Sequence, residues 1–125
     1  MTRNVLRWLA TIWIIALIAG SLMPSQTKAT LGLVGTRPPN LEHRVVHFVG
    51  FGIGELLLLF LATNRRQEAS RVIGVVSLGL GLELTQYFVL SARYFEWWDV
   101  RDDVIGIVTA LLLVDITRAC KWIST

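Results

Sequence analysis

The chain has 125 residues, a hydrophobic fraction of 54% and a formal net charge of +3 at pH 7. Its mean hydropathy is +0.58 and its apolar residues come in blocks, which is a membrane composition and argues against an ordinary water-soluble domain. The 12 Lys and Arg residues form no basic stripe, which argues against nucleic acid as a partner, and a single cysteine allows neither an intrachain disulfide nor a Cys-based metal motif.

Four apolar segments are predicted to be transmembrane helices, because about 20 mostly apolar helical residues cross a hydrocarbon core of about 30 Å. The first covers residues 6–23 and ends before Pro24, and the second and third cover 45–63 and 72–90. The fourth covers 99–118, since its uncharged stretch is too short to span alone and must extend back through Asp99. Residues 1–125 are thus predicted to form a single domain, an all-α integral membrane bundle of four helices.

The first segment has a second interpretation as a signal peptide, with Arg3 and Arg7 before an apolar core and Ala29 as a cleavage site. The bulky Trp8 and Trp13 and the length of the apolar stretch favour an uncleaved first helix.

The connections set the path of the predicted bundle. Residues 24–44 form an irregular loop, while residues 64–71 and 91–98 form short connections that make successive helices antiparallel neighbours. Small residues let helices approach closely in lipid, and those singled out for such contacts are Gly50, Gly54, Gly74, Gly79 and Gly81. The last connection is aromatic, as suits the headgroup layer, with Tyr94, Phe95, Trp97 and Trp98.

Basic residues predict the orientation of this bundle. On the side of both termini lie Arg3, Arg7, Arg65, Arg66, Arg71, Arg118 and Lys121, and on the other side lie Lys28, Arg37, Arg44, Arg93 and Arg101. The positive-inside rule therefore places both termini in the cytoplasm.

Polar residues stand at three places that an up-down-up-down path brings to one membrane face. His47 begins the second helix, Glu83 and Gln86 end the third, Asp99, Asp102 and Asp103 begin the fourth, and Arg44, Arg93 and Glu96 join them from the loops. Residues three or four apart share a helix face, so Glu83 with Gln86 and Asp99 with Asp103 form stripes that can point inward. The sequence predicts one polar cluster at the outer interface.

Intramembrane carboxylates are costly and are functional candidates by default, which also applies to Glu55, two turns below His47. Each residue has a structural explanation too: Glu83 can bond to a backbone group, His47 can be a satisfied interfacial histidine, and the aspartates can cap a helix. Asp115 is interpreted as a solvated or paired interface charge. The convergence of the group favours function. Carboxylates beside His47 could bind a hard cation, but one histidine and no thiol give weak selectivity, so no metal site is predicted and no cofactor is identified.

The polar motifs resemble those of the VanZ-like family of small bacterial membrane proteins over most of the chain. They are, in order, Glu42-His43-Arg44-Val45-Val46-His47-Phe48 with Phe51 one turn on, then Glu83 and Gln86, then Arg93, Glu96, Asp99, Asp103 and Gly106. The family usually has lysine where Arg44 stands and asparagine where Asp103 stands. The resemblance implies a multi-pass protein of the bacterial cytoplasmic membrane. The founding member is linked to reduced susceptibility to the glycopeptide teicoplanin, a label that does not transfer with the fold.

Three functions are open at this point. The first is a cell-envelope protein that binds or modifies a lipid-linked or amphiphilic substrate, such as an envelope intermediate or a glycopeptide or lipopeptide. Its catalytic candidates are His47, Glu83 and Asp99, and its substrate-binding candidates are Arg44, Gln86, Arg93, Glu96 and Asp103. The second is a non-catalytic module that binds lipid or a protein partner and uses the cluster as a structural lock. The third, a proton-coupled carrier, would require an oligomer.

Overall fold

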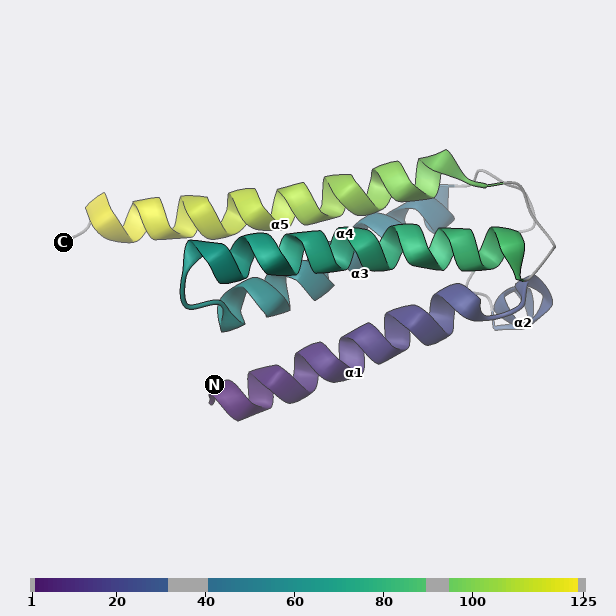
Figure 1. Ribbon diagram of the computed structural model, residues 1–125, viewed down its shortest axis with the longest axis horizontal. Coiled ribbons are helices and arrows are strands. Elements are labelled where there is room, and N and C mark those ends of the chain that lie inside the picture. Colours follow the sequence, from purple (N-terminus) through teal and green to yellow (C-terminus); the bar gives the residue numbers. More distant parts are fainter. Residues whose placement is uncertain (1, 32–40, 90–94, 124–125) are drawn as a thin grey trace.

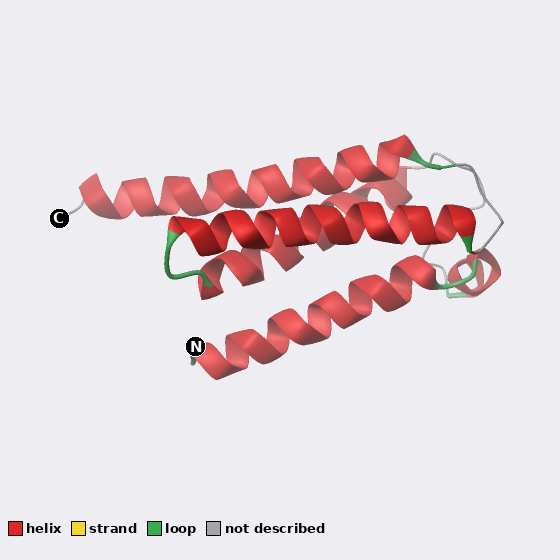
Figure 2. Ribbon diagram, viewed as in Figure 1, coloured by secondary structure: helices red, strands yellow, loops and turns green. Residues whose placement is uncertain are grey.

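The computed structural model describes residues 2–31, 41–89 and 95–123. Within these residues it is all-helical and contains no strand, which confirms the all-α prediction (Figure 2). The helices are α1 (Arg3–Leu22), α2 (Ser25–Thr30), α3 (Leu41–Leu61), α4 (Arg65–Phe88) and α5 (Trp97–Ile123). The start of α1 and the end of α5 lie at one end of the bundle (Figure 1). The starts of α3 and α5 and the end of α4 lie at the other, which we call the α2 end.

Two helices of the described chain are long and apolar enough to cross a membrane. These are α1 and α3, with mean hydropathies of 1.9 and 1.8. Helices α4 and α5 do not meet the same criterion over their described residues. Two membrane-length helices agree with part of the predicted topology, and the four-span arrangement is taken up below as a proposal.

Each long helix begins before its predicted span, because an apolar run marks the membrane core and not the ends of a helix; α1, α3 and α4 end one or two residues before the predicted ends, and α5 ends after its own. Helix α4 begins within the predicted second connection, where the Asn64 side chain accepts a hydrogen bond of 2.9 Å from the backbone N–H of Gln67. Arg44 lies in the first turns of the longer α3 rather than in a loop.

The connection predicted as irregular over residues 24–44 contains the short helix α2, and its last residues belong to α3. Residues 32–40 lie outside the described residues. The prediction of an irregular loop was therefore wrong for α2 and for the start of α3, since the polar residues of this region also have adequate helix propensity.

Helix α1 packs against α3 over two glycines, as the sequence predicted for Gly50 and Gly54. A Cβ atom on Gly50 would lie 2.9 Å from Leu17, and one on Gly54 would lie 3.3 Å from Trp13. The Trp13 indole donates a hydrogen bond of 2.8 Å to the carbonyl oxygen of Gly50. An uncleaved first helix would keep this packing, and retention of α1 stays a prediction.

The variant Trp13→Phe tests this interpretation. It removes the hydrogen bond to Gly50 but keeps an aromatic ring, and we expect the full chain in detergent to lose about 1 kcal/mol of unfolding free energy. Chemical denaturation followed by circular dichroism measures the loss, and mass spectrometry of the purified protein shows whether α1 is present. Equal stability of the two proteins, or a mature chain that lacks α1, would contradict the interpretation.

The tightest glycine contact joins α3 to α5. A Cβ on Gly52 would lie 3.2 Å from the carbonyl oxygen of Gly106, and a Cβ on Gly106 would collide with the carbonyl oxygen of Phe48. Neither glycine was predicted as a helix contact. By contrast, a Cβ added to Gly74 or Gly81 would have no neighbour within 4 Å among the described residues, so the predicted contact was wrong for both.

Gly79 behaves as predicted. A Cβ there would lie 2.9 Å from Asp103 and 3.1 Å from the ring of Phe51. Phe51 is one of the buried core residues. The core cluster consists of Phe51, Val75, Leu82 and Ile107, from α3, α4 and α5. These three helices hold the polar groups described next.

Candidate functional site

Polar side chains from α3, α4 and α5 meet at the α2 end, as the predicted path requires. His43 and His47 are four residues apart on one face of α3, with ring centroids 4.7 Å apart. Asp99 and Asp103 have the same spacing on the facing side of α5. The two stripes lie against each other because Gly52 and Gly106 let the helices approach closely just below them.

Two short contacts join the histidines to the aspartates. His43 Nε2 lies 2.9 Å from Asp99 Oδ2, and His47 Nδ1 lies 2.9 Å from Asp103 Oδ1. The second nitrogen of His47, Nε2, lies 3.5 Å from the same Asp99 oxygen. Both aspartates are buried. We call these four residues the histidine centre.

Two glutamates border the histidine centre. Glu83 on α4 is buried, and its Oε2 accepts a 3.4 Å hydrogen bond from the backbone N–H of Glu96. Glu96 Oε2 in turn lies 3.8 Å from His43 Nε2. Glu83 thus bonds to a backbone group just before α5, which is the structural role considered for it from the sequence. It also lies next to the histidine centre.

One predicted binding residue, Gln86, is not linked to the centre, and another, Arg93, is not described by the structure. Gln86 is partly buried one turn beyond Glu83, and within the described residues no hydrogen bond links it to the cluster. Arg93 lies outside the described residues, as does Tyr94.

A second group of charges lies on the outer side of the α3–α5 contact. Asp102 is buried and accepts hydrogen bonds from Arg44 Nε at 2.8 Å and from Arg101 Nε and Nη2 at 2.9 and 2.5 Å. The Arg101 guanidinium also lies 4.6 Å from the centre of the Trp98 ring. The side chains of Arg44 and Arg101, which we call the arginine pair, are 43% and 38% exposed. With Asp102 the group carries a net charge of +1.

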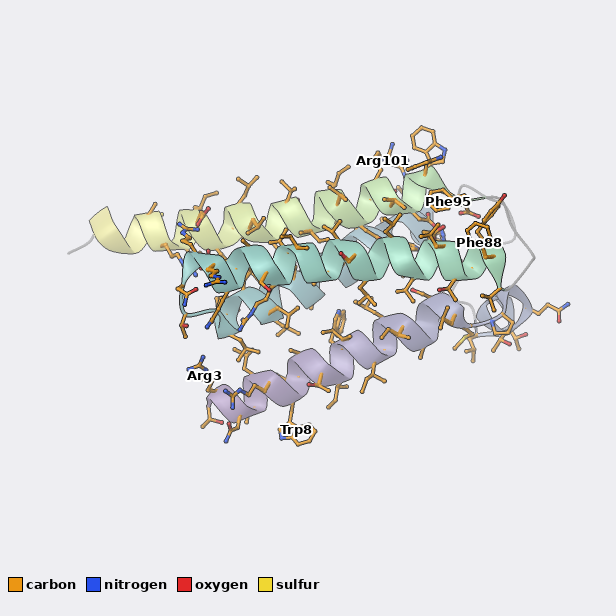
Figure 3. The ribbon with its side chains drawn as sticks, viewed as in Figure 1. Arg3, Trp8, Phe88, Phe95 and Arg101 are labelled. Atoms are coloured by element: carbon orange, nitrogen blue, oxygen red, sulfur yellow. The ribbon has the colours of Figure 1, made fainter. Side chains whose placement is uncertain are left out.

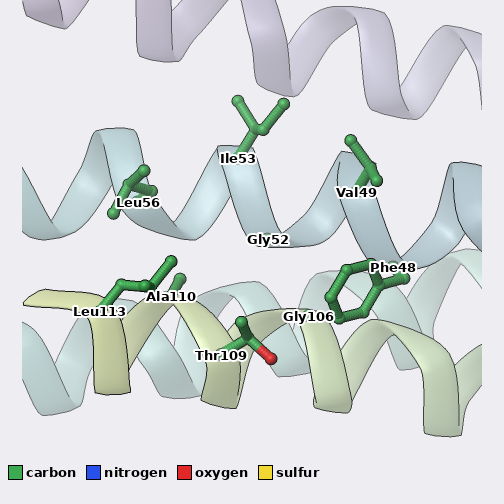
Figure 4. A pocket seen from close by; sticks show the side chains of 9 residues that line it. All are labelled: Phe48, Val49, Gly52, Ile53, Leu56, Gly106, Thr109, Ala110 and Leu113. Carbon is green, nitrogen blue, oxygen red and sulfur yellow. The ribbon is translucent and has the colours of Figure 1, made fainter.

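An apolar groove begins one helical turn below the arginine pair. Phe48 follows Arg44 by four residues, and Gly106 follows Asp102 by four, so each lies on the same helix face as the charge above it. The groove has a volume of about 170 Å³ between α3 and α5 (Figure 4). It is lined by Phe48, Val49, Gly52, Ile53, Leu56, Gly106, Thr109, Ala110 and Leu113.

Sequence reasoning missed His43 and Arg101 as site residues. The spacing of His43 and His47, His-x-x-x-His on one helix, was a usable signal, because it places both rings on one face. Arg101 gave no comparable signal, since its role depends on the rotation of α5 about its axis.

Glu55 lies deeper in α3 and is fully buried. Within the described residues neither of its carboxylate oxygens has a hydrogen-bond partner, and the opposite charge that acts on it is Arg71 of α4. It makes no contact with the histidine centre among those residues, so the structure separates it from the candidate site.

Charges at the other end of the bundle form a separate network. Glu68 is buried and pairs with Arg65 at 2.9 Å and with Arg118 at 2.7 Å. Asp115 lies 2.8 Å from Arg65, as expected of a paired interface charge, and this hydrogen bond raises the pKa of the Arg65 guanidinium above its ordinary value. The network ties the start of α4 to the end of α5.

Comparison of the chain with protein-family models, curated proteins and solved structures finds no match. The resemblance to the VanZ-like family therefore stays a hypothesis that rests on the three motifs.

Proposed function

We propose that this chain is an integral protein of the bacterial cytoplasmic membrane that binds an anionic amphiphile at the α2 end. The arginine pair would hold the headgroup, and the groove between α3 and α5 would hold part of an acyl chain. The observation that carries the proposal is the position of two partly exposed guanidinium groups directly above an apolar groove.

Exposed apolar side chains on all four long helices support a membrane location. Examples are Trp8 and Ile12 on α1, Phe60 on α3, Ile73 on α4 and Leu112 on α5, each at least 57% exposed. Soluble monomers rarely leave so much apolar surface open to water, whereas lipid would cover it.

Burial of charge explains how α4 and α5 could also span the membrane. Carboxylates lower the mean hydropathy of α4 and α5. Three of them, Glu83, Asp99 and Asp103, are buried between helices. Two others, Glu68 and Asp115, lie at the end of the bundle opposite the α2 end. Lipid would therefore meet side chains such as Leu84 and Val108. Intramembrane charges usually face the bundle interior in this way.

Aromatic side chains support a membrane interface at the α2 end. Phe88 and Trp97 are each 71% exposed, and Trp98 is 58% exposed. Phe88, Phe95 and Arg101 lie at this end, and Arg3 lies at the opposite end (Figure 3). Aromatic residues concentrate in the headgroup layer, and the positive-inside rule puts the α2 end on the outer face. The proposed site would then face the outer leaflet.

The positive charge and the N–H donors of the arginine pair favour an anionic headgroup. Each guanidinium has five N–H donors in a fork that suits phosphate or carboxylate, and Asp102 uses only part of them. Asp102 holds both side chains in position, while their exposed edges remain accessible.

The histidine centre supports two further versions of this function. The His47–Asp103 contact orients an imidazole as in acid–base sites, which fits modification of the bound substrate. The same buried contacts also join α3 to α5, which fits a non-catalytic binding module with a structural lock.

Binding of phosphatidylglycerol tests the proposal. We expect native mass spectrometry of the detergent-solubilised protein to show retained phosphatidylglycerol in preference to phosphatidylcholine. The double variant Arg44→Gln/Arg101→Gln should lower the affinity for phosphatidylglycerol about tenfold or more, because charge-assisted hydrogen bonds are about twice as strong as neutral ones.

Two further variants separate the headgroup from the tail. Arg65→Gln removes an exposed arginine at the other end and should leave the lipid preference unchanged. Thr109→Phe fills the groove without a change of charge and should weaken binding of both lipids. Equal phosphatidylglycerol binding by the wild type and the double variant would refute the proposal.

A further inference from the structure

Three donor atoms converge within the histidine centre. His43, His47 and Asp99 each offer one ligand atom, and these atoms all lie within 4.8 Å of one another. His43 Nε2 and His47 Nε2 lie 2.9 and 3.5 Å from one carboxylate oxygen, Asp99 Oδ2. Donors bound to a tetrahedral zinc ion at about 2.0–2.1 Å are roughly 3.3 Å apart, so the two separations from Asp99 Oδ2 need only small adjustments.

We infer that His43, His47 and Asp99 form a binding site for a divalent transition-metal ion, with Zn²⁺ as the ion that the donors suit best. Two histidines four residues apart on one helix present both rings to the same point, as in helical zinc sites. Asp99 supplies the third ligand from a second helix. Two imidazoles and one carboxylate, with a fourth position left for water or substrate, are a common donor set for catalytic zinc.

Asp103 would orient His47 as a metal ligand from behind. Its contact with His47 Nδ1 at 2.9 Å fixes the proton on that nitrogen and leaves the lone pair on Nε2, the nitrogen nearer to Asp99. Gly79 leaves room for this carboxylate, because a Cβ there would lie only 2.9 Å from Asp103 Oδ2. A carboxylate behind a metal-ligating histidine is the usual arrangement around zinc.

The local charge also calls for a cation. Asp99, Asp103 and Glu83 are buried together, and Glu96 lies 3.8 Å from His43. Among the described residues, the guanidinium groups of Arg44 and Arg101 pair with Asp102 rather than with Asp99, Asp103 or Glu83. A divalent ion would offset buried carboxylates that are costly alone.

Hydrogen bonding alone would also explain these contacts, and the metal titration below distinguishes the two explanations. If a metal binds, the donor types decide which one. Nitrogen and carboxylate ligands without a thiolate suit Zn²⁺, Co²⁺ and related ions rather than Ca²⁺ or Mg²⁺, which prefer only oxygen. From the sequence only His47 was expected to lie beside carboxylates, and His43 supplies the second nitrogen that makes the site selective.

Metal binding to the full, untagged chain in detergent tests the inference without added lipid, so the outcome is independent of amphiphile binding. After removal of metal with EDTA, we expect titration calorimetry and elemental analysis to show about one Zn²⁺ per chain. Co²⁺ should give the visible absorption of a low-coordinate nitrogen and oxygen site. The variants His43→Gln and Asp99→Asn should each weaken Zn²⁺ binding at least about 100-fold, and Asp103→Asn should weaken it about 10- to 100-fold.

Controls separate this site from surface binding. Asp115→Asn removes a carboxylate at the other end, and Cys120→Ser removes the thiol; neither should change the affinity. Helicity and size-exclusion profiles confirm that each protein is folded. A folded wild type that binds no Zn²⁺, or an equal loss in Asp115→Asn and His43→Gln, would overturn the inference. If a ligand variant fails to fold, the Co²⁺ spectrum of the wild type still decides, since absence of the bands contradicts the proposed donor set.

Discussion

The variant Gly106→Ala is expected to separate α3 from α5 and to destabilise the chain by about 3 kcal/mol or more. A Cβ at this position would collide with the carbonyl oxygen of Phe48 and would lie 3.1 Å from the backbone nitrogen of Gly52. These are backbone atoms, so no side-chain rotation relieves the overlap and one helix must move. The His43–Asp99 and His47–Asp103 contacts join the same two helices and would be lost with the packing.

Thermal unfolding in detergent, followed by circular dichroism, measures this loss. Gly74→Ala and Gly81→Ala are matched controls, because both glycines lie in helix α4 and the new methyl group would meet no described atom within 4 Å. Alanine has the higher helix propensity, so the controls should be neutral or stabilised by up to about 1 kcal/mol. If the Gly106→Ala protein is as stable as the Gly74→Ala protein, α3 and α5 do not make the close contact at Gly106.

The sequence was sufficient to predict the four long helices and the place where their polar ends meet. Apolar blocks and short connections imply antiparallel neighbours, and this path alone brings His47 next to Asp99 and Asp103. The prediction needed only the order of the helices and the end at which each polar residue lies.

The details that depend on helix rotation were beyond the sequence. In a mostly apolar helix the hydrophobic period is weak, so it does not say which face turns to which neighbour. Gly52 and Gly106 were therefore not predicted as helix contacts, while Gly74 and Gly81 were predicted wrongly. Arg44 was placed in a loop because the apolar run begins only after it, and its pairing with Asp102 was not foreseen.

The distribution of charge at the α2 end assigns different tasks to neighbouring groups. Asp102 takes both arginines on the outer side, where their edges remain exposed. The inner carboxylates, Asp99 and Asp103, face histidines instead. A headgroup site and a metal site could thus lie side by side, and a metal ion next to a bound phosphate would supply the Lewis acid that modification of such a substrate uses.

Replacement of Glu55 by leucine is expected to stabilise the protein by about 1–3 kcal/mol, the usual cost of burying a polar group without a hydrogen-bond partner. Glu55 is 0% exposed, and neither carboxylate oxygen has a hydrogen-bond partner within the part of the chain that the structure describes. Its surroundings are apolar, with Phe51 and Leu59 buried one turn away on either side. Arg71, the opposite charge that acts on Glu55, donates a hydrogen bond to the carbonyl oxygen of Leu58 and keeps that partner in the variant.

The sign of this change distinguishes two roles for Glu55. Chemical unfolding in detergent measures the change in unfolding free energy of Glu55→Leu. Glu42→Leu is the control, because the Glu42 carboxylate is exposed on the same helix and its replacement should change stability by less than about 0.5 kcal/mol. A more stable Glu55→Leu protein means that the buried carboxylate is kept at a cost to folding, and such costs persist where a residue has a function. A less stable protein means that attraction to Arg71 outweighs desolvation, and Glu55 is then a structural partner of α4.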